Sequence, residues 1–299
     1  MVINISRPYK VVITTIVDDY SGFTRLLGVH GLSMYIEVYV DDRVESILFD
    51  VGPSGTVLSH NVKELNIDIG KVKAIVLSHN HYDHTGGLEY VIKSMVSSKN
   101  RPIVIAHPNI FKQSLYIDEE SQRLDIGIPY SRQYLEGLGT KMLLIRSPLQ
   151  ISPSTYYLGE IKQYTDIDVE KYKKGFYTIL GTGEVVPDKL EDDTGIAVKV
   201  EGLGIIVISG CSHSGIANIV YQASKQLNDN VYAVIGGFHM IKYDRKDIEE
   251  TIRAFKDLGV EEIYVGHCTG FKAEKILSDA YKESFTKLYS GLKMIFQQK

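Results

Sequence analysis

The stretch His79-Asn80-His81-Tyr82-Asp83-His84 decides the fold that we predict for this chain. It places three imidazoles and a carboxylate within six residues, directly after the apolar run Ala74-Ile75-Val76-Leu77. Imidazole and carboxylate groups are the usual protein ligands of zinc and of other divalent first-row metal ions. An apolar strand that ends in such a cluster therefore predicts a metal site at the C-terminal edge of a sheet.

The second half of the chain repeats this pattern three times. Apolar runs lead into Gly210-Cys211-Ser212-His213, Gly236-Gly237-Phe238-His239 and Gly266-His267-Cys268-Thr269-Gly270. Six of the nine histidines thus follow predicted strands. Because functional groups in α/β sheets gather beyond the C-terminal ends of the strands, we expect these histidines to share one site.

Strands and helices alternate along most of the chain. We predict strands at 10–17, 33–40, 44–49, 71–77, 102–106, 196–200, 204–209, 231–235 and 261–265, with helices at about 54–65, 88–96, 214–227, 248–258 and 272–296. Between about 111 and 187 the apolar runs are short and are interrupted by prolines. We predict that this segment is a long insertion that acts as a lid or faces the substrate.

The bulk composition is that of an ordinary globular protein, with 44% hydrophobic and 23% charged residues. The net charge of −4 argues against a broad nucleic-acid-binding surface. The two cysteines, Cys211 and Cys268, lie beside histidines and do not suggest a secretory disulfide framework. No run approaches the roughly 20 apolar residues that span a bilayer. We therefore expect a cytoplasmic protein without a membrane-spanning segment.

These residues and their order resemble the metallo-β-lactamase superfamily. His79-x-His81-x-Asp83-His84 matches its signature, Leu48-Phe49-Asp50-Val51-Gly52 matches the preceding strand and turn, and His267 stands where a final ligand is expected. The resemblance implies an α/β fold, the four-layer αβ/βα sandwich, with a dinuclear metal cleft at one edge. It also implies one domain over residues 1–299, with the lid-like insertion at approximately 111–187.

One branch of that superfamily fits best. Gly31-Leu32-Ser33, Gly210–Gly215, Gly236–His239 and His267–Gly270 are similar to the branch related to the archaeal dihydropterin–ribofuranosylaminobenzene phosphate synthases. The likeness implies a small-molecule substrate, either phosphorylated or pterin-like. Many members of the branch are only called metal-dependent hydrolases.

The resemblance implies two divalent metal ions, with zinc favoured and Mn²⁺ or Fe²⁺ as alternatives. We assign His79 and His81 to the first ion. The second ion takes Asp83, His84 and His267. Asp50 is expected to orient a ligand histidine by accepting a hydrogen bond from its other ring nitrogen.

Two ligand positions stay open. Cys211 stands where the superfamily usually has a metal-bridging Asp, so it is either a thiolate ligand or a small buried residue. No histidine occurs between His107 and His213, where the superfamily has another ligand. Asp192 or Asp193 is a candidate oxygen ligand there, which would favour Mn²⁺ or Fe²⁺. The alternatives are that His213 turns back to the first ion, or that this acidic loop is simply solvated.

Asp83, His213 and His239 are the predicted catalytic residues, because each is placed to bind a substrate group or to transfer a proton. We expect a structural role for His107, and no pattern supports His30 or His60. Four aromatic residues of the insertion, Tyr156, Tyr157, Phe176 and Tyr177, either stack on a planar substrate or pack against one another.

The function that we predict first is a dinuclear metal-dependent hydrolase acting on a small phosphorylated or heterocyclic substrate. The first alternative is a transferase that joins a dihydropterin diphosphate to ribofuranosylaminobenzene 5′-phosphate in methanopterin-type cofactor biosynthesis. The second alternative is a metal-binding or ligand-binding protein without turnover. Nucleic-acid processing is disfavoured by the charge, and the sequence predicts no oligomeric state.

Overall fold

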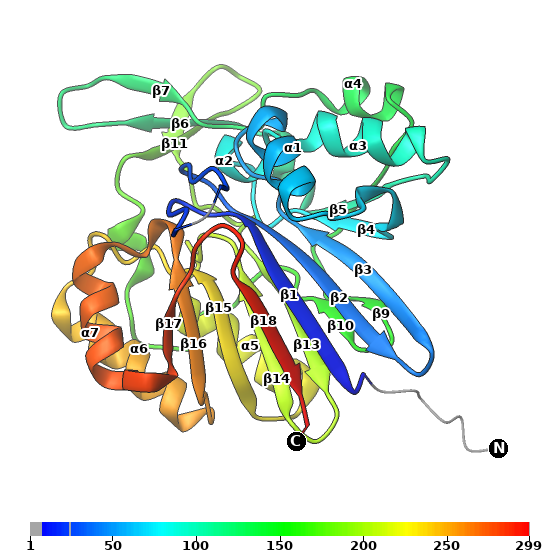
Figure 1. The fold of residues 1–299 in the computed structure, drawn as a ribbon. Helices are drawn as coiled ribbons and strands as arrows, with labels where there is room; N and C mark the ends of the chain where they lie inside the picture. Colours follow the sequence, from blue (N-terminus) through cyan, green and yellow to red (C-terminus); the bar gives the residue numbers. More distant parts are fainter. Residues whose placement is uncertain (1–7, 24, 299) are drawn as a thin grey trace.

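Two seven-stranded sheets form the frame of the molecule in the computed structural model, which describes residues 8–23 and 25–298 (Figure 1). The sheets pack face to face, and helices cover the outer face of each. This is the four-layer αβ/βα sandwich that the sequence predicts, so the fold prediction is confirmed.

The first sheet has the order β18-β1-β2-β3-β4-β5-β8. Its strands are β1 (Lys10–Val17), β2 (Ser33–Val40), β3 (Arg43–Phe49), β4 (Ala74–Val76), β5 (Ile103–Ala106), β8 (Lys141–Leu144) and β18 (Lys293–Gln297). Pairing is antiparallel from β18 to β3 and parallel from β3 to β8. The parallel half therefore brings several strand ends to one edge.

The second sheet has the order β17-β16-β15-β14-β13-β10-β9. Its strands are β9 (Leu149–Ser152), β10 (Thr155–Tyr157), β13 (Gly195–Val200), β14 (Gly204–Ser209), β15 (Val231–Gly237), β16 (Glu262–Gly266) and β17 (Phe285–Lys287). It is parallel from β14 to β17 and antiparallel on the other side. Both sheets thus have a parallel half.

The helices lie outside the sheets (Figure 1). They are α1 (Gly55–Glu64), α2 (Tyr82–Thr85), α3 (Leu88–Ser97), α4 (Arg132–Gly137), α5 (Ile216–Leu227), α6 (Arg245–Asp257) and α7 (Phe271–Tyr281). Short 3₁₀ turns occur at Ile69–Lys71, Pro108–Phe111, Val169–Tyr172, His267–Thr269 and Lys282–Ser284.

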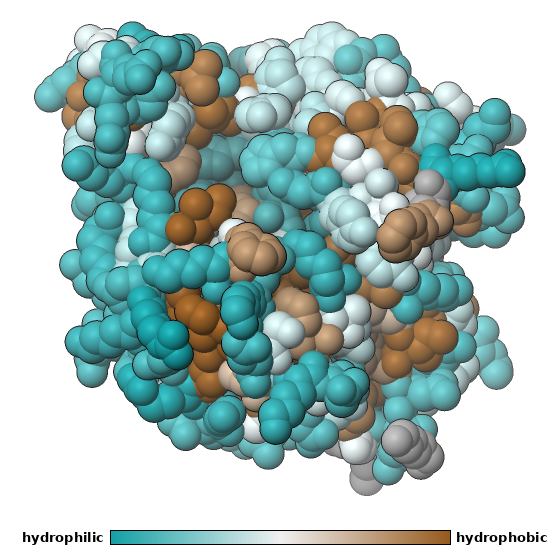
Figure 2. Space-filling model, turned by 60° about the vertical axis from the view of Figure 1, so that its left-hand side comes forward, coloured by the Kyte–Doolittle hydropathy of each residue, from teal (hydrophilic) through white to brown (hydrophobic). Residues whose placement is uncertain are grey.

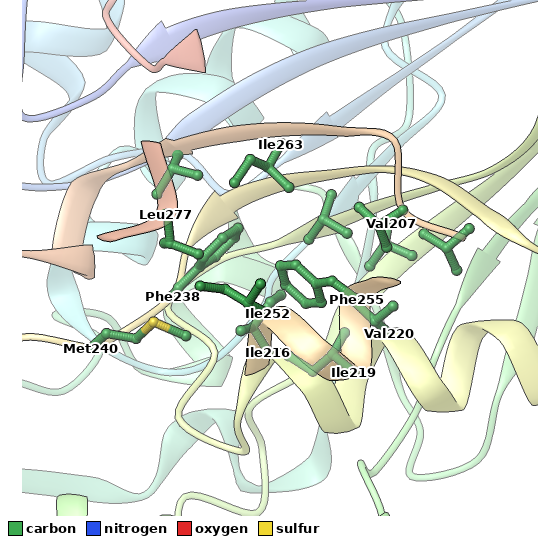
Figure 3. Close-up of a cluster of buried hydrophobic side chains, with 14 of the residues drawn as sticks. Val207, Ile216, Ile219, Val220, Phe238, Met240, Ile252, Phe255, Ile263 and Leu277 are labelled. Atoms are coloured by element: carbon green, nitrogen blue, oxygen red, sulfur yellow. The ribbon is translucent and has the colours of Figure 1, made fainter. Parts of the chain in front are cut away.

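Alternation along the strands separates three hydrophobic layers. In β3, Ile47 and Phe49 point between the two sheets, whereas Leu48 points outward to the layer under α1 and α3. On the second sheet, Val207 and Ile263 pack against Phe255 and its neighbours on the outer helices (Figure 3). Because successive residues of a strand face opposite sides, near-continuous apolar runs are what a sheet buried on both faces requires.

The segment expected as one insertion, 111–187, is divided among three sheets. Strand β8 extends the first sheet, and β9 and β10 extend the second. The remainder includes a third, four-stranded sheet of β6 (Gln113–Ile117), β7 (Arg123–Asp125), β11 (Phe176–Ile179) and β12 (Val185–Pro187). In Figure 1 this third sheet lies at the upper left.

The predicted helix at 272–296 is wrong beyond residue 281. Helix α7 stops at Tyr281, and the positive φ of 51° at Lys282 interrupts it, because residues inside an α-helix have negative φ. The chain then forms β17 and β18, and β18 pairs antiparallel with β1. Residues 293–297 alternate between exposed and buried, which is the period of a strand and not of a helix.

In the described part of the chain, no helix is long and apolar enough to cross a membrane.

Candidate metal centre

The loop after β4 carries the signature residues to the edge shared by the two sheets. His79 follows the strand, and the short helix α2 presents Asp83 and His84. This loop lies so close to the turn after β3 that a Cβ on Gly86 would come within 1.9 Å of the Pro53 carbonyl oxygen. Only glycine fits there, so the Gly86 position is fixed by backbone contact.

Three buried imidazoles form the first half of the site. The ring centroids of His79 and His81 are 4.5 Å apart, and each lies 5.0 Å from the ring of His213. Within the described residues, Nε2 of His79, Nε2 of His81 and both ring nitrogens of His213 are buried without a hydrogen-bond partner. Burial lowers the pKa of all three, that of His81 to about 3, so the rings are neutral and can act as ligands.

The second half contains Asp83, His84 and His267. Oδ2 of Asp83 lies 3.3 Å from Nε2 of His84 and 3.3 Å from Nε2 of His267. The two Nε2 atoms are themselves 3.1 Å apart. These three side chains thus direct one ligand atom each to a common point.

Cys211, at the end of β14, lies between the two halves. Its Sγ atom is 3.4 Å from Nε2 of His84 and 3.2 Å from Nε2 of His267. It belongs both to a group with Asp83, His84 and His267 and to a group with His79 and His213, in which all ligand atoms lie within 4.8 Å of one another. This shared position is the one expected of a bridging ligand, and it favours the thiolate interpretation of Cys211.

Further carboxylates orient the histidines. Asp50 lies where the sequence places it, with Oδ2 2.7 Å from Nδ1 of His84. Asp19 has the same relation to His267, with 2.7 Å between Oδ1 and Nδ1, and Oδ2 of Asp18 accepts from the His267 backbone N–H at 3.0 Å. The sequence reasoning missed Asp18 and Asp19, although both directly follow the first strand and so occupy the same kind of position as Asp50.

The carboxylates of the acidic loop before β13 contact backbone N–H groups and Lys112, whereas Oδ1 of Asp193 is buried without a hydrogen-bond partner among the described residues. Oδ2 of Asp192 accepts from the backbone N–H of Asn80 at 2.9 Å, and Oδ1 pairs with the ammonium of Lys112. Oδ2 of Asp193 accepts from the Ser214 backbone N–H at 2.8 Å, and burial raises the pKa of Asp193 to about 6. Neither carboxylate belongs to a ligand group among the described residues. His213 shares a ligand group with His79, and this position favours His213 over Asp192 and Asp193 as the remaining ligand of the first ion.

A cavity of about 370 Å³ opens onto the centre. His239 lies on its wall, with its ring 4.2 Å from that of His213 and its Nδ1 buried without a partner among the described residues. His30, for which the sequence offered no role, also lines the cavity. Its Nδ1 is 2.8 Å from Oδ2 of Asp19, and its ring stacks 4.8 Å from that of His267.

Of the remaining candidates, only Phe176 is among the described residues that line this cavity. His107 contacts Glu160, with 2.8 Å between Nε2 and Oε1, which agrees with a structural role. His60 contacts the Arg25 carbonyl oxygen. Of the four aromatic residues that we considered in the insertion, Phe176 lines the cavity, whereas Tyr156 and Tyr157 lie in β10 of the second main sheet.

The chemistry of these residues fits bound divalent metal. A carboxylate, a thiol and the imidazoles of His79, His84, His213 and His267 converge from both sheets. The ring of His81 lies 4.5 Å from that of His79, outside the ligand groups, and several of the buried nitrogens have no protein partner among the described residues. A buried polar atom without a hydrogen bond costs about 1–3 kcal/mol, so such atoms at one point indicate a ligand.

Comparison with known proteins identifies the family to which this chain belongs. A metal-dependent hydrolase of the β-lactamase superfamily, Tm1679, superposes with a TM-score of 0.78 and 27% identity, covering 96% of this chain and 100% of that chain. The 7,8-dihydropterin-6-methyl-4-(β-D-ribofuranosyl)-aminobenzene-5′-phosphate synthase of Methanocaldococcus jannaschii is 41% identical over 97% of this chain and 98% of its own length. This chain belongs to the family of that synthase, within the metallo-β-lactamase superfamily.

Further matches are less similar to this chain than the M. jannaschii synthase is. The metallo-β-lactamase fold protein YhfI of Bacillus subtilis gives a TM-score of 0.56 at 15% identity, covering 96% of this chain and 99% of its own. An uncharacterized protein of M. jannaschii is 31% identical over 88% of this chain and 93% of its own length. A family model described as the anti-Pycsar protein Apyc1 matches residues 38–133.

Proposed function

We propose that this protein joins a dihydropterin diphosphate to ribofuranosylaminobenzene 5′-phosphate. The observation that carries the proposal is the 41% identity to the M. jannaschii synthase, which extends over 97% of the chain and includes the metal-centre residues' strands and loops. The sequence alone ranked a hydrolase first and this transferase second. The likeness over the whole chain reverses that order.

The proposed centre holds two divalent ions. His79, His81 and His213 would hold one ion, Asp83, His84 and His267 would hold the other, and the Cys211 thiol lies between the two sets of side chains. A donor set rich in nitrogen with one sulfur favours zinc over Mn²⁺ or Fe²⁺. When bound, the ions supply positive charge that offsets the negative charge of a diphosphate leaving group.

The proposed reaction forms one bond and breaks one. The aminobenzene nitrogen bonds to the methylene carbon on the pterin, the bond from that carbon to the diphosphate oxygen breaks, and the diphosphate leaves with the electron pair. The nitrogen loses a proton, and His239 is positioned on the cavity wall to accept it at its unpartnered Nδ1. Asp83 and His213, also predicted as catalytic, act in this proposal by binding metal.

A hydrolase is the second candidate. The observation that favours it is the 27% identity and TM-score of 0.78 to Tm1679, a metal-dependent hydrolase. In a hydrolase, water takes the place of the aminobenzene nitrogen, and no second organic substrate is consumed.

Incubation of the zinc-loaded protein with both substrates distinguishes the two candidates. The synthase proposal predicts that the pterin diphosphate and the aminobenzene ribotide disappear in equal amounts, with one diphosphate released for each product. The His79→Ala variant, which removes a proposed ligand, is the control. Loss of the pterin diphosphate at the same rate without the acceptor supports the hydrolase, and a metal-loaded protein that forms no joined product contradicts the synthase.

A further inference from the structure

We propose that Lys242 binds the 5′-phosphate of the aminobenzene substrate, and that a row of Phe176, Tyr116 and Leu124 holds the ring between this phosphate and the metal centre. The inference rests on the proposed function and names the orientation of one substrate in the cavity. The amine end points to the metal ligands, and the phosphate end lies at the cavity mouth.

The row crosses three strands of the third sheet. Phe176 on β11 is paired with Tyr116 on β6, and Tyr116 is paired with Leu124 on β7. Directly paired residues project from the same face of a sheet, so these three side chains form one continuous apolar strip. All three line the cavity, and the rings of Phe176 and Tyr116 are 5.4 Å apart.

One end of the row touches the metal centre. The ring of Phe176 is stacked on that of His81 at 5.5 Å, with 15° between the planes, and lies 5.2 Å from the ring of His213. Any ligand that packs along this row therefore has one end beside the histidines proposed to bind the first ion.

The middle residue of the row, Tyr116, touches Lys242. Its Nζ atom lies 3.3 Å from the Tyr116 hydroxyl and 5.6 Å from the centre of the Tyr116 ring. Among the residues that line the cavity, Lys242 alone carries a fixed positive charge. Within the described residues, no carboxylate forms an ion pair with Lys242, whereas other exposed lysines such as Lys171 and Lys275 are paired with an acid.

The surroundings of Lys242 are apolar. Ile241, the preceding residue, is 60% exposed, and Leu124 is 55% exposed. Figure 2 shows this side of the molecule, with hydrophobic residues exposed among hydrophilic ones. An unpaired ammonium beside exposed apolar side chains suits a ligand that combines an aromatic ring with a phosphate, because one part covers the apolar surface and the other neutralises the charge.

The order of groups in the acceptor matches the order of groups in the cavity. In ribofuranosylaminobenzene 5′-phosphate, the amine and the ribose are attached to the same benzene ring, and the phosphate is at the far end of the ribose. Along the cavity, the proposed metal-binding histidines come first, then Phe176 and Tyr116, and then Lys242. The amine, the ring and the phosphate of the acceptor follow one another in this order. The diphosphate of the other substrate is proposed to lie at the metal ions, so the two phosphorylated groups occupy separate places.

Binding and kinetics with the phosphorylated acceptor and with its dephosphorylated form test the inference. For Lys242→Ala we expect the Kd and the KM of the phosphorylated acceptor to rise by at least about tenfold, because the variant loses a charge-assisted hydrogen bond to the phosphate. The values for the dephosphorylated form should not change, and kcat at saturation should be retained. Lys242→Arg should keep most of the affinity, and the exposed Lys246→Ala serves as the matched control.

The ring contacts have their own test. Tyr116→Leu should weaken the binding of the phosphorylated and of the dephosphorylated acceptor by the same factor, because it removes the aromatic surface and leaves the lysine in place. Unchanged binding of both forms in this variant contradicts the row as the ring site.

Two results overturn the assignment of Lys242. The first is that Lys242→Ala leaves the Kd of both forms of the acceptor unchanged. The second is that Lys242→Ala raises the Kd of both forms by the same factor. If the wild-type protein forms the joined product and Lys242→Ala behaves like it, the inference fails while the proposed function stands. If the wild-type protein forms no product, the proposed function itself has failed.

Discussion

Cys211 is the residue on which the two halves of the metal centre depend. It is the only side chain shared by the group around His79 and the group around His84 among the described residues. The residue before it, Gly210, lies against the start of the signature loop, since a Cβ on Gly210 would come within 2.1 Å of the Ser78 hydroxyl oxygen. A larger residue at position 210 would therefore displace the chain beside Cys211.

Replacement of Cys211 by Ala should lower the metal content of both halves. We expect the purified variant to retain less than one ion per chain after dialysis, whereas Cys211→Asp, which restores an anionic ligand, should bind more. Elemental analysis measures this directly. Cys268→Ala is the matched control, because Cys268 is also buried at the site but belongs only to a group with Cys211 and His239. Equal metal loss in both alanine variants contradicts a bridging role for Cys211.

His213 and Asp192 offer opposite predictions about the remaining ligand. His213→Ala should weaken metal binding by at least about tenfold, because it removes a proposed ligand. Asp192→Asn should retain bound metal and instead lower the unfolding temperature, because it weakens the contact of Asp192 with Lys112. Titration with zinc and thermal unfolding of the same two variants measure both effects. The reverse pattern would restore the carboxylate as the ligand.

At the scale of elements, the parallel halves of the two sheets were predictable and the additions to them were not. Runs such as 204–209 and 231–235 are apolar throughout and are followed by glycine and histidine, so the sequence indicates both the strand and the site at its end. Strand β18 was mistaken for helix because its pairing with β1 joins residues almost the whole chain apart. Local patterns do not contain such long-range pairing.

The third sheet is tied to the signature loop by residues between the histidines. The Asn80 side chain donates to the Lys112 carbonyl oxygen at 3.0 Å and to the Ser114 hydroxyl at 2.9 Å, and the Tyr82 backbone N–H donates to the Ile126 carbonyl oxygen at 2.9 Å. His79 and His81 thus face the metal site while Asn80 holds the sheet that forms the cavity wall.

Lys112→Met tests this connection. The change removes the Lys112 ammonium, which lies between Asp188 and Asp192. The side chains of these two acids are 5% and 0% exposed, and both lose their positively charged partner. Breaking a buried ion pair from one side costs about 3–5 kcal/mol, so chemical denaturation should show a loss of that order. The exposed pair of Lys93 and Glu89 provides the control, since Lys93→Met should change the unfolding free energy very little. Equal effects of the two substitutions contradict the structural role of Lys112.

At the scale of the whole molecule, the site is built from residues that lie far apart in the sequence. The signature loop was identified from the sequence because its ligands are adjacent, and His267 was identified from its place after a strand. Asp19 and His30 were missed because their relation to His267 exists only after both sheets have packed together. The choice between Asp192 and His213 also required the folded geometry. Asp192 precedes strand β13 and His213 follows strand β14, so the sequence allows either residue to reach the metal site.

Anomalous X-ray diffraction from crystals of the zinc-loaded protein tests the central claim most directly. The account predicts two zinc peaks, one among His79, His81 and His213 and one among Asp83, His84 and His267, with the Cys211 sulfur in contact with both. A single peak, no peak at these histidines, or a peak bound by Asp192 or Asp193 would contradict it.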